Sequence, residues 1–84
     1  MFYLIMCRSL TYAQRAANAL ERAGIPVRLL RSPAEISPTG CSYSVKLPAR
    51  YLSRAVTVLN RNRLPYGGIY VKGADYGGYR EVEP

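Results

Sequence analysis

Two cysteines are the residues of this sequence best suited to covalent chemistry. Cys7 ends an apolar run, and Cys41 follows a loop rich in serine, proline and glycine. The sequence contains no histidine, which excludes a histidine-based triad, a histidine general base and a histidine metal ligand. Two thiols in one chain also cannot supply a four-cysteine metal site or a secreted disulfide framework. We therefore expect thiol chemistry without a metal or cofactor, and the composition disfavours a conventional enzyme.

The two thiols lie in a basic chain. It carries 12 basic and 5 acidic residues, and most of the basic residues are arginines. Positions 1–74 are strongly basic, whereas positions 75–84 hold Arg80 against three acidic residues. Arginine favours bidentate contacts with phosphate or carboxylate groups. The charge is equally consistent with simple solubility and with a site that recognises anions.

The opening run Met1–Cys7 is apolar, but Arg8 ends it. A segment of this length is too short to cross a bilayer, which needs about 18 apolar residues. It also lacks the basic leader and small-residue cleavage site of a signal peptide. We therefore expect a cytoplasmic protein with reduced thiols and no membrane contact.

Hydrophobic patterning predicts two strand–helix–strand units. Apolar residues spaced as on one face of a helix predict helices over Leu10–Ala23 and from Pro48 to just before Pro65. Ser9 or Thr11 can cap the first helix, and Gly24 suits its C-terminal end. The expected strands are Phe2–Cys7, Val27–Leu30, Tyr43–Leu47 and Tyr66–Val71. Ser44 and Lys46 predict that one face of the third strand is more exposed to solvent.

The two units repeat at a shift of 39 residues, with six identities over positions 12–26. The identical pairs are Tyr12 and Tyr51, Arg15 and Arg54, Ala16 and Ala55, Leu20 and Leu59, Arg22 and Arg61, and Pro26 and Pro65. Two interleaved units predict an α+β, ferredoxin-like split βαβ fold (βαββαβ). In that fold a four-stranded antiparallel sheet of order 4-1-3-2 carries two helices on one face. We assign residues 1–72 to this domain and residues 73–84 to a weakly ordered C-terminal tail.

This topology places the two cysteines at one edge of the sheet, because the first and third strands are neighbours. The N-terminus of the first helix shares that edge, and so do Arg8, Arg31 and Arg63. Positive charge and a helix N-terminus lower the pKa of a nearby thiol. Cys41 is then the candidate reactive group, although an inert thiol fits the pattern equally well. Cys7 is a secondary thiol that fits a small buried hydrophobic residue better. The candidate binding residues around Cys41 are Arg8, Ser9, Arg31, Gly40 and Ser42.

Several short motifs follow one another along the chain. An apolar strand leads into Arg8–Ser9, then an alanine-rich helix, the step Ala23–Val27, a Pro/Ser-rich loop that reaches Cys41, and Gly68–Tyr70. In these motifs, over about residues 3–71, the chain resembles the putative selenium/sulfur carrier protein-like family. The resemblance implies that Cys41 carries sulfur or selenium, as a persulfide or selenopersulfide, between a donor and an acceptor protein. Ser42 stands where that family often has glycine.

Two other functions stay open. A basic ferredoxin-like sheet with eight tyrosines could bind nucleic acid through phosphate contacts, which would be weak. The sheet face without helices could instead be buried in a homodimer, and we expect Tyr3, Ile5, Leu30 and Tyr70 on that face.

Overall fold

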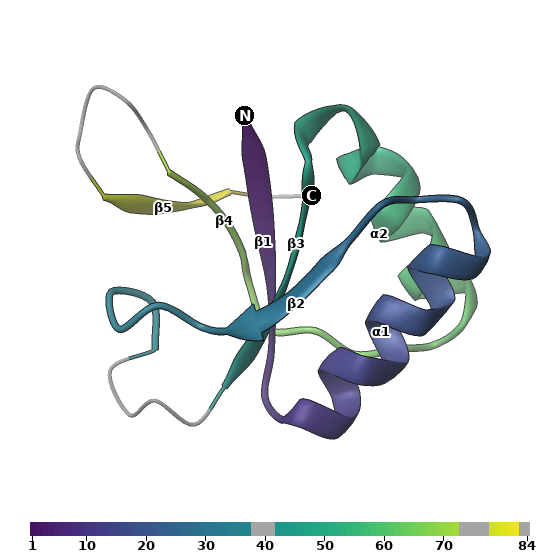
Figure 1. The fold of residues 1–84 in the computed structure, drawn as a ribbon, viewed down its shortest axis with the longest axis horizontal. Coiled ribbons are helices and arrows are strands. Elements are labelled where there is room, and N and C mark those ends of the chain that lie inside the picture. The colour runs from purple at the N-terminus through teal and green to yellow at the C-terminus, as the bar shows by residue number, and fades with distance from the viewer. Residues whose placement is uncertain (38–41, 73–77, 83–84) are drawn as a thin grey trace.

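The fold comes from a computed structural model, which describes residues 1–37, 42–72 and 78–82. Over these residues the chain forms an α+β structure, in which one antiparallel sheet is packed against two helices (Figure 1). The elements in chain order are β1 (Phe2–Cys7), α1 (Leu10–Arg22), β2 (Arg28–Arg31), β3 (Tyr43–Pro48), a 3₁₀ helix η1 (Ala49–Tyr51), α2 (Leu52–Arg61), β4 (Ile69–Lys72) and β5 (Tyr79–Val82).

The sheet has five strands in the order β2-β3-β1-β4-β5. The predicted order of the first four strands is confirmed. The strand β1 pairs with β3 on one side and with β4 on the other, and β3 also pairs with β2. The predicted count of four strands is wrong, because β5 pairs antiparallel with β4 from Ile69↔Val82 to Lys72↔Tyr79. Neither the short Tyr79–Val82 stretch nor its charged centre predicts a strand. The edge of β4 supplies its hydrogen-bond partners, and Val82 packs against the core.

Both helices cover the same face of the sheet (Figure 1). The repeat explains this packing, since the paired Ala16 and Ala55 are buried and the paired Leu20 and Leu59 are fully buried. Alanines allow close approach, and leucines fill the space between helix and sheet. Together with the inward residues of β1, β3 and β4, they form one hydrophobic core. Its members are Ile5, Cys7, Ala13, Ala16, Ala17, Leu20, Ile25, Val45, Leu47, Ala55, Leu59 and Ile69.

The helix ends follow local chemistry. Ser9 caps α1 by accepting a hydrogen bond from Tyr12 N at 3.3 Å, and Gly24 follows the helix with a positive φ of 81°. The predicted start of the second helix at Pro48 is wrong. Pro48 ends β3 with extended backbone, and η1 intervenes before α2 begins at Leu52.

The last predicted strand also begins later than its pattern suggests, at Ile69 rather than Tyr66. The glycines before it still pair with β1, since Gly67 N donates to Met6 O at 2.7 Å and Met6 N donates to Gly68 O at 2.8 Å. A Cβ on Gly68 would lie 2.9 Å from the Tyr70 ring. A side chain at this position would therefore require the Tyr70 ring and the Glu81 carboxylate to shift.

The strand register separates the side chains into two faces, because directly opposite residues point the same way. Ile5 pairs with Val45 and Ile69 on the face that the helices cover. Leu4 pairs with Lys46 and Tyr70 on the other face, which we call the open face.

The expected composition of the open face is partly wrong. Tyr3 and Ile5 belong to the helix-covered side, where Tyr3 packs against the core and Ile5 is part of it. Leu30 and Tyr70 lie on the open face, since their register partners Ser44 and Leu4 do. Alternation along each strand decides which face a side chain occupies. In β1 the residues on both faces are apolar, so composition alone does not reveal which of them face the helices.

Candidate functional site

Cys41 and Gly40, the centre of the predicted site, lie outside the described residues. The strands around the site are described. Cys7 lies opposite Tyr43 in the β1–β3 pair, and Tyr43 lies opposite Arg31 in the β3–β2 pair. One row across three strands therefore joins Cys7, Tyr43 and Arg31, and the predicted adjacency of the first and third strands is confirmed.

Arg31 contributes charge to this row while its side chain is exposed. Its guanidinium carbon lies 5.8 Å from the centroid of the Tyr43 ring, which is a cation–π contact. The β2–β3 pairing continues one step further, since Ser32 N donates to Ser42 O at 3.1 Å. The backbone directly after Cys41 is thus tied to the strand that carries Arg31.

Arg8 and Ser9 lie where β1 turns into α1. The Arg8 guanidinium carbon is 5.1 Å from the Tyr12 ring centroid, and Ser9 is occupied as the α1 cap. Arg8 also lines a small hollow of about 170 Å³ with Pro65, Tyr66 and Gly67. The connection between α2 and β4 therefore reaches this edge, as the topology predicts. Arg63 does not line the hollow. It is exposed and has a φ of 55° just after α2.

Cys7 is a core residue rather than a reactive thiol. Its side chain is fully buried, and its Sγ makes only a weak 4.0 Å contact with Ile5 O. Burial raises the pKa of Cys7 from 9.0 to about 11, because a thiolate is poorly stabilised away from water. Arg8 follows it directly in the sequence, yet the lowered pKa expected for a thiol at this edge does not hold for Cys7.

A group of buried serines at this edge was not predicted. Ser32 Oγ and Ser44 Oγ share a hydrogen bond of 2.7 Å, and both side chains are buried. The expectation that Ser44 faces water is therefore wrong, since the hydroxyl of Ser32 replaces water as its partner. Ser37 and Ser42, on either side of residues 38–41, are also buried. The alternation of Ser42 and Ser44 was the sequence feature that could have revealed these serines. Alternation does not, however, distinguish a solvent-exposed serine from a buried serine that is hydrogen-bonded within the protein.

Ser42 differs from the other serines in one respect. Its Oγ is buried and has no hydrogen-bond partner within the described part of the chain. Buried hydroxyls nearly always have a partner, and leaving one unpaired costs about 1–3 kcal/mol. A buried hydroxyl without a partner among the described residues therefore lies one residue from Cys41 in the sequence.

The chain was compared with known protein families, curated proteins and solved structures. A family model described as "Putative Se/S carrier protein-like" matches residues 2–71. No curated protein and no solved structure matches the chain. Over the described residues, no helix is long and apolar enough to cross a membrane.

Proposed function

This chain belongs to the Putative Se/S carrier protein-like family, and from that membership we propose that it carries sulfur or selenium on Cys41. The observation that carries the proposal concerns the other thiol. The sequence has two cysteines, and Cys7 is fully buried with its pKa raised to about 11. A carrier thiol must be a thiolate that partners can reach, which supports Cys41 over Cys7 as the proposed carrier residue.

The proposed transfer is a thiol exchange without net oxidation. The Cys41 thiolate attacks the outer sulfur of a donor protein's persulfide. The donor's sulfur–sulfur bond breaks, and the donor leaves as a thiolate while Cys41 becomes the persulfide. An acceptor thiolate then removes the outer sulfur and restores the Cys41 thiolate. A selenopersulfide would transfer selenium in the same way.

The neighbouring residues have separate roles in this proposal. Arg8 and Arg31 supply the positive charge that favours a thiolate. Ser42 supplies a buried hydroxyl, without a partner among the described residues, that can donate to sulfur. Ser9 fixes the N-terminus of α1 at the same edge. Gly40, which lies outside the described residues, has no side chain that would hinder the backbone of a partner. The strand order of β1 to β4 also supports a ferredoxin-like arrangement as the scaffold.

Intact-mass spectrometry tests the carrier directly. The full chain is incubated with glutathione persulfide, and we expect one added sulfur atom per chain. Cys41→Ser should abolish the addition, whereas the matched control Cys7→Ala should retain it. Sulfur addition to Cys41→Ser at the wild-type level would contradict the proposal.

The tuning residues need a second measurement. In a Cys7→Ala background, the alkylation rate against pH reports the pKa of the Cys41 thiol. Arg8→Gln and Arg31→Gln should raise that pKa, whereas Arg15→Gln on the exposed side of α1 should not. An unperturbed pKa near ~8.5 in the parent would contradict a tuned nucleophile.

A weak nucleic-acid contact is the alternative function, and net charge is the observation that favours it. Phosphate contacts alone give dissociation constants of roughly 10⁻⁴–10⁻⁶ M at physiological salt. A fluorescence-polarisation titration with a single-stranded oligonucleotide should stay in this range and lose binding as salt rises. Sub-micromolar, sequence-dependent binding would favour the nucleic-acid module instead.

A cytoplasmic location and a homodimer through the open face stay predictions. Cell fractionation tests the first, and sedimentation velocity over a range of protein concentrations tests the second. The charge of the open face, described next, weighs against the homodimer.

A further inference from the structure

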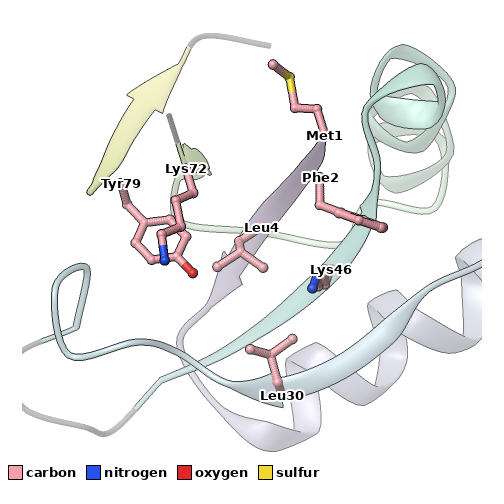
Figure 2. Close-up of a pocket in the computed structure, with 7 residues that line it drawn as sticks. All are labelled: Met1, Phe2, Leu4, Leu30, Lys46, Lys72 and Tyr79. Carbon is pink, nitrogen blue, oxygen red and sulfur yellow. The ribbon is translucent and has the colours of Figure 1, made fainter. Parts of the chain in front are cut away.

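The open face contains a pocket of about 410 Å³ to which every strand of the described sheet contributes (Figure 2). Its volume falls within the range of about 300–1,000 Å³ that is usual for small-molecule sites. The lining residues are Met1, Phe2, Leu4, Leu30, Lys46, Lys72 and Tyr79.

The pocket is apolar with aromatic walls. Leu4, only 3% exposed, lies at the centre of the sheet, and Leu30 comes from β2. Phe2 is 51% exposed, although its ring lies beside the pocket. With Tyr79 from β5, these side chains offer a surface on which a planar ring can pack.

The two lysines of the chain, Lys46 and Lys72, both line this pocket. They flank Leu4, because β1 lies between β3 and β4 and Leu4 pairs with Lys46 (Figure 2). Lys46 Nζ is 4.5 Å from the Phe2 ring centroid, and Lys72 Nζ is 5.9 Å from the Tyr79 ring centroid. Each ammonium group is thus held against an aromatic wall.

No acidic side chain is among the lining residues that the structure describes. Glu81 lies on the same face, but its carboxylate is beside Gly68 and Tyr70. Within the described residues, no ion pair joins Lys46 or Lys72 to a carboxylate. The pocket therefore combines an apolar surface with two positive charges that no carboxylate of the described residues neutralises.

We propose that this pocket binds a small aromatic anion, with its ring against Leu4, Leu30 and Phe2 and its acidic group between Lys46 and Lys72. A carboxylate, sulfonate or phosphate on a planar ring has this chemistry. The proposal does not rest on sulfur transfer, since the described lining comes from all five strands and does not include Cys7.

Charge favours such an anion over a second copy of the chain. A two-fold dimer brings the same patch of both copies together. The four ammonium groups of two such patches would then meet at one contact, which opposes association. An anion instead neutralises the two lysines of a single pocket.

Two fluorescent probes test the proposal on the full chain. 8-Anilinonaphthalene-1-sulfonate is an aromatic anion, and N-phenyl-1-naphthylamine has the same rings without the sulfonate. We expect saturable sulfonate binding, weakened about fivefold by Lys46→Met and by Lys72→Met. Binding of the neutral probe should change little. Arg15→Met on α1 is the matched control, because it removes one positive charge outside the pocket.

Lysine protection gives an independent readout. Mild acylation followed by peptide mass mapping should show slower modification of Lys46 and Lys72 in the presence of the sulfonate. Near-UV circular dichroism identifies any variant that has lost its tertiary structure, and amide chemical shifts of wild-type protein then locate the bound probe. Cys41→Ser should bind the sulfonate like wild type, which separates this proposal from the carrier function.

Several results would overturn the proposal. One is an equal loss of sulfonate binding in the lysine variants and in Arg15→Met. Another is displacement of the probe by a single-stranded oligonucleotide at lower concentrations than by its mononucleotide, which would favour a nucleic-acid strand. A third is sulfonate binding that falls as sedimentation shows dimer formation, which would assign the face to a second copy.

Discussion

The two faces of β1 carry similar residues in different surroundings. Ile5 is fully buried beneath the helices, and Leu4 on the opposite face is only 3% exposed. The apolar composition of Phe2–Cys7 predicts a strand covered on both sides, yet both helices lie on one side (Figure 1). Leu4 is instead surrounded by side chains of its own sheet, including Lys46. A strand that is apolar on both faces therefore does not require two covering layers.

The difference between the faces also separates their chemistry. The helix-covered face holds the Cys7 thiol in the core. The open face holds the two lysine ammonium groups and the exposed ring of Phe2. Truncations on the helix-covered face should therefore disturb the packed core, whereas substitutions on the open face should mainly change exposed charged and aromatic groups.

The largest expected effect comes from truncating the helix-covered face. Ile5→Ala should lower the free energy of unfolding by about 2–5 kcal/mol, because it leaves a cavity in a packed core. Phe2→Ala on the open face should cost less than about 1 kcal/mol, because that ring is already 51% exposed. Urea denaturation of both variants measures the contrast, and equal losses would contradict it.

A pH titration sharpens the comparison at Cys7. Its pKa rises from 9.0 to about 11 in the fold, so the folded state holds the thiol proton more tightly than the unfolded chain. The stabilisation is complete below pH 9 and is lost as pH rises towards 11, by about 2 kcal/mol. Unfolding free energies of the parent and Cys7→Ala, both in a Cys41→Ser background, should therefore converge over this window. A constant difference would mean that the thiol is not desolvated.

Unlike the exposed Phe2 ring, the buried pair of Ser32 and Ser44 on the open face should contribute to stability. Ser32→Ala should destabilise the fold by about 1–2 kcal/mol, because Ser44 Oγ loses its partner. Ser32→Ala combined with Ser44→Ala should cost less than the sum of the two single changes. Thermal unfolding of the four proteins completes this cycle. Additive losses would show that the 2.7 Å contact contributes no coupling.

The smallest expected effect lies in the helix layer. Arg54 Nη2 donates to Ala23 O at 2.7 Å and so ties α2 to the end of α1. Arg54→Gln should cost about 0.5–1 kcal/mol, because the contact is exposed. Arg15→Gln, at the equivalent repeat position, provides the control and should have a smaller effect. Chemical denaturation decides between them, and a larger loss for Arg15→Gln would contradict this role of Arg54.

Much of the fold could be predicted because the two units share one pattern. The repeat identities Ala16/Ala55 and Leu20/Leu59 are core contacts, so the sequence shows directly which helix faces turn inwards. The strand β5 could not be predicted, since a four-residue strand depends on the neighbouring edge rather than on its own periodicity. Pro48 suits the start of a helix, but it also suits the extended end of β3, and pairing with Phe2 decided the matter.

The candidate site was less predictable than the fold. Strand order was enough to predict that Cys7 and Arg31 lie at the same edge of the sheet, where Tyr43 is in register with both. The pKa of the Cys7 thiol is raised by burial, although Arg8 is its neighbour in the sequence. The two lysines lie 26 positions apart along the chain, and only the register of β3, β1 and β4 shows that they share a pocket. The role of Cys41 stays a prediction.

The two outer strands bear on the solubility of the protein. A sheet edge can recruit strands of other molecules, and charged residues on the edge oppose such growth. Arg28 and Arg31 enclose Leu29 and Leu30 in β2, while the opposite edge, β5, carries Arg80 and Glu81 at its centre. Each edge strand is also only four residues long. Neutral substitutions at both β2 arginines would therefore leave an apolar edge, and the expected consequence is aggregation rather than unfolding.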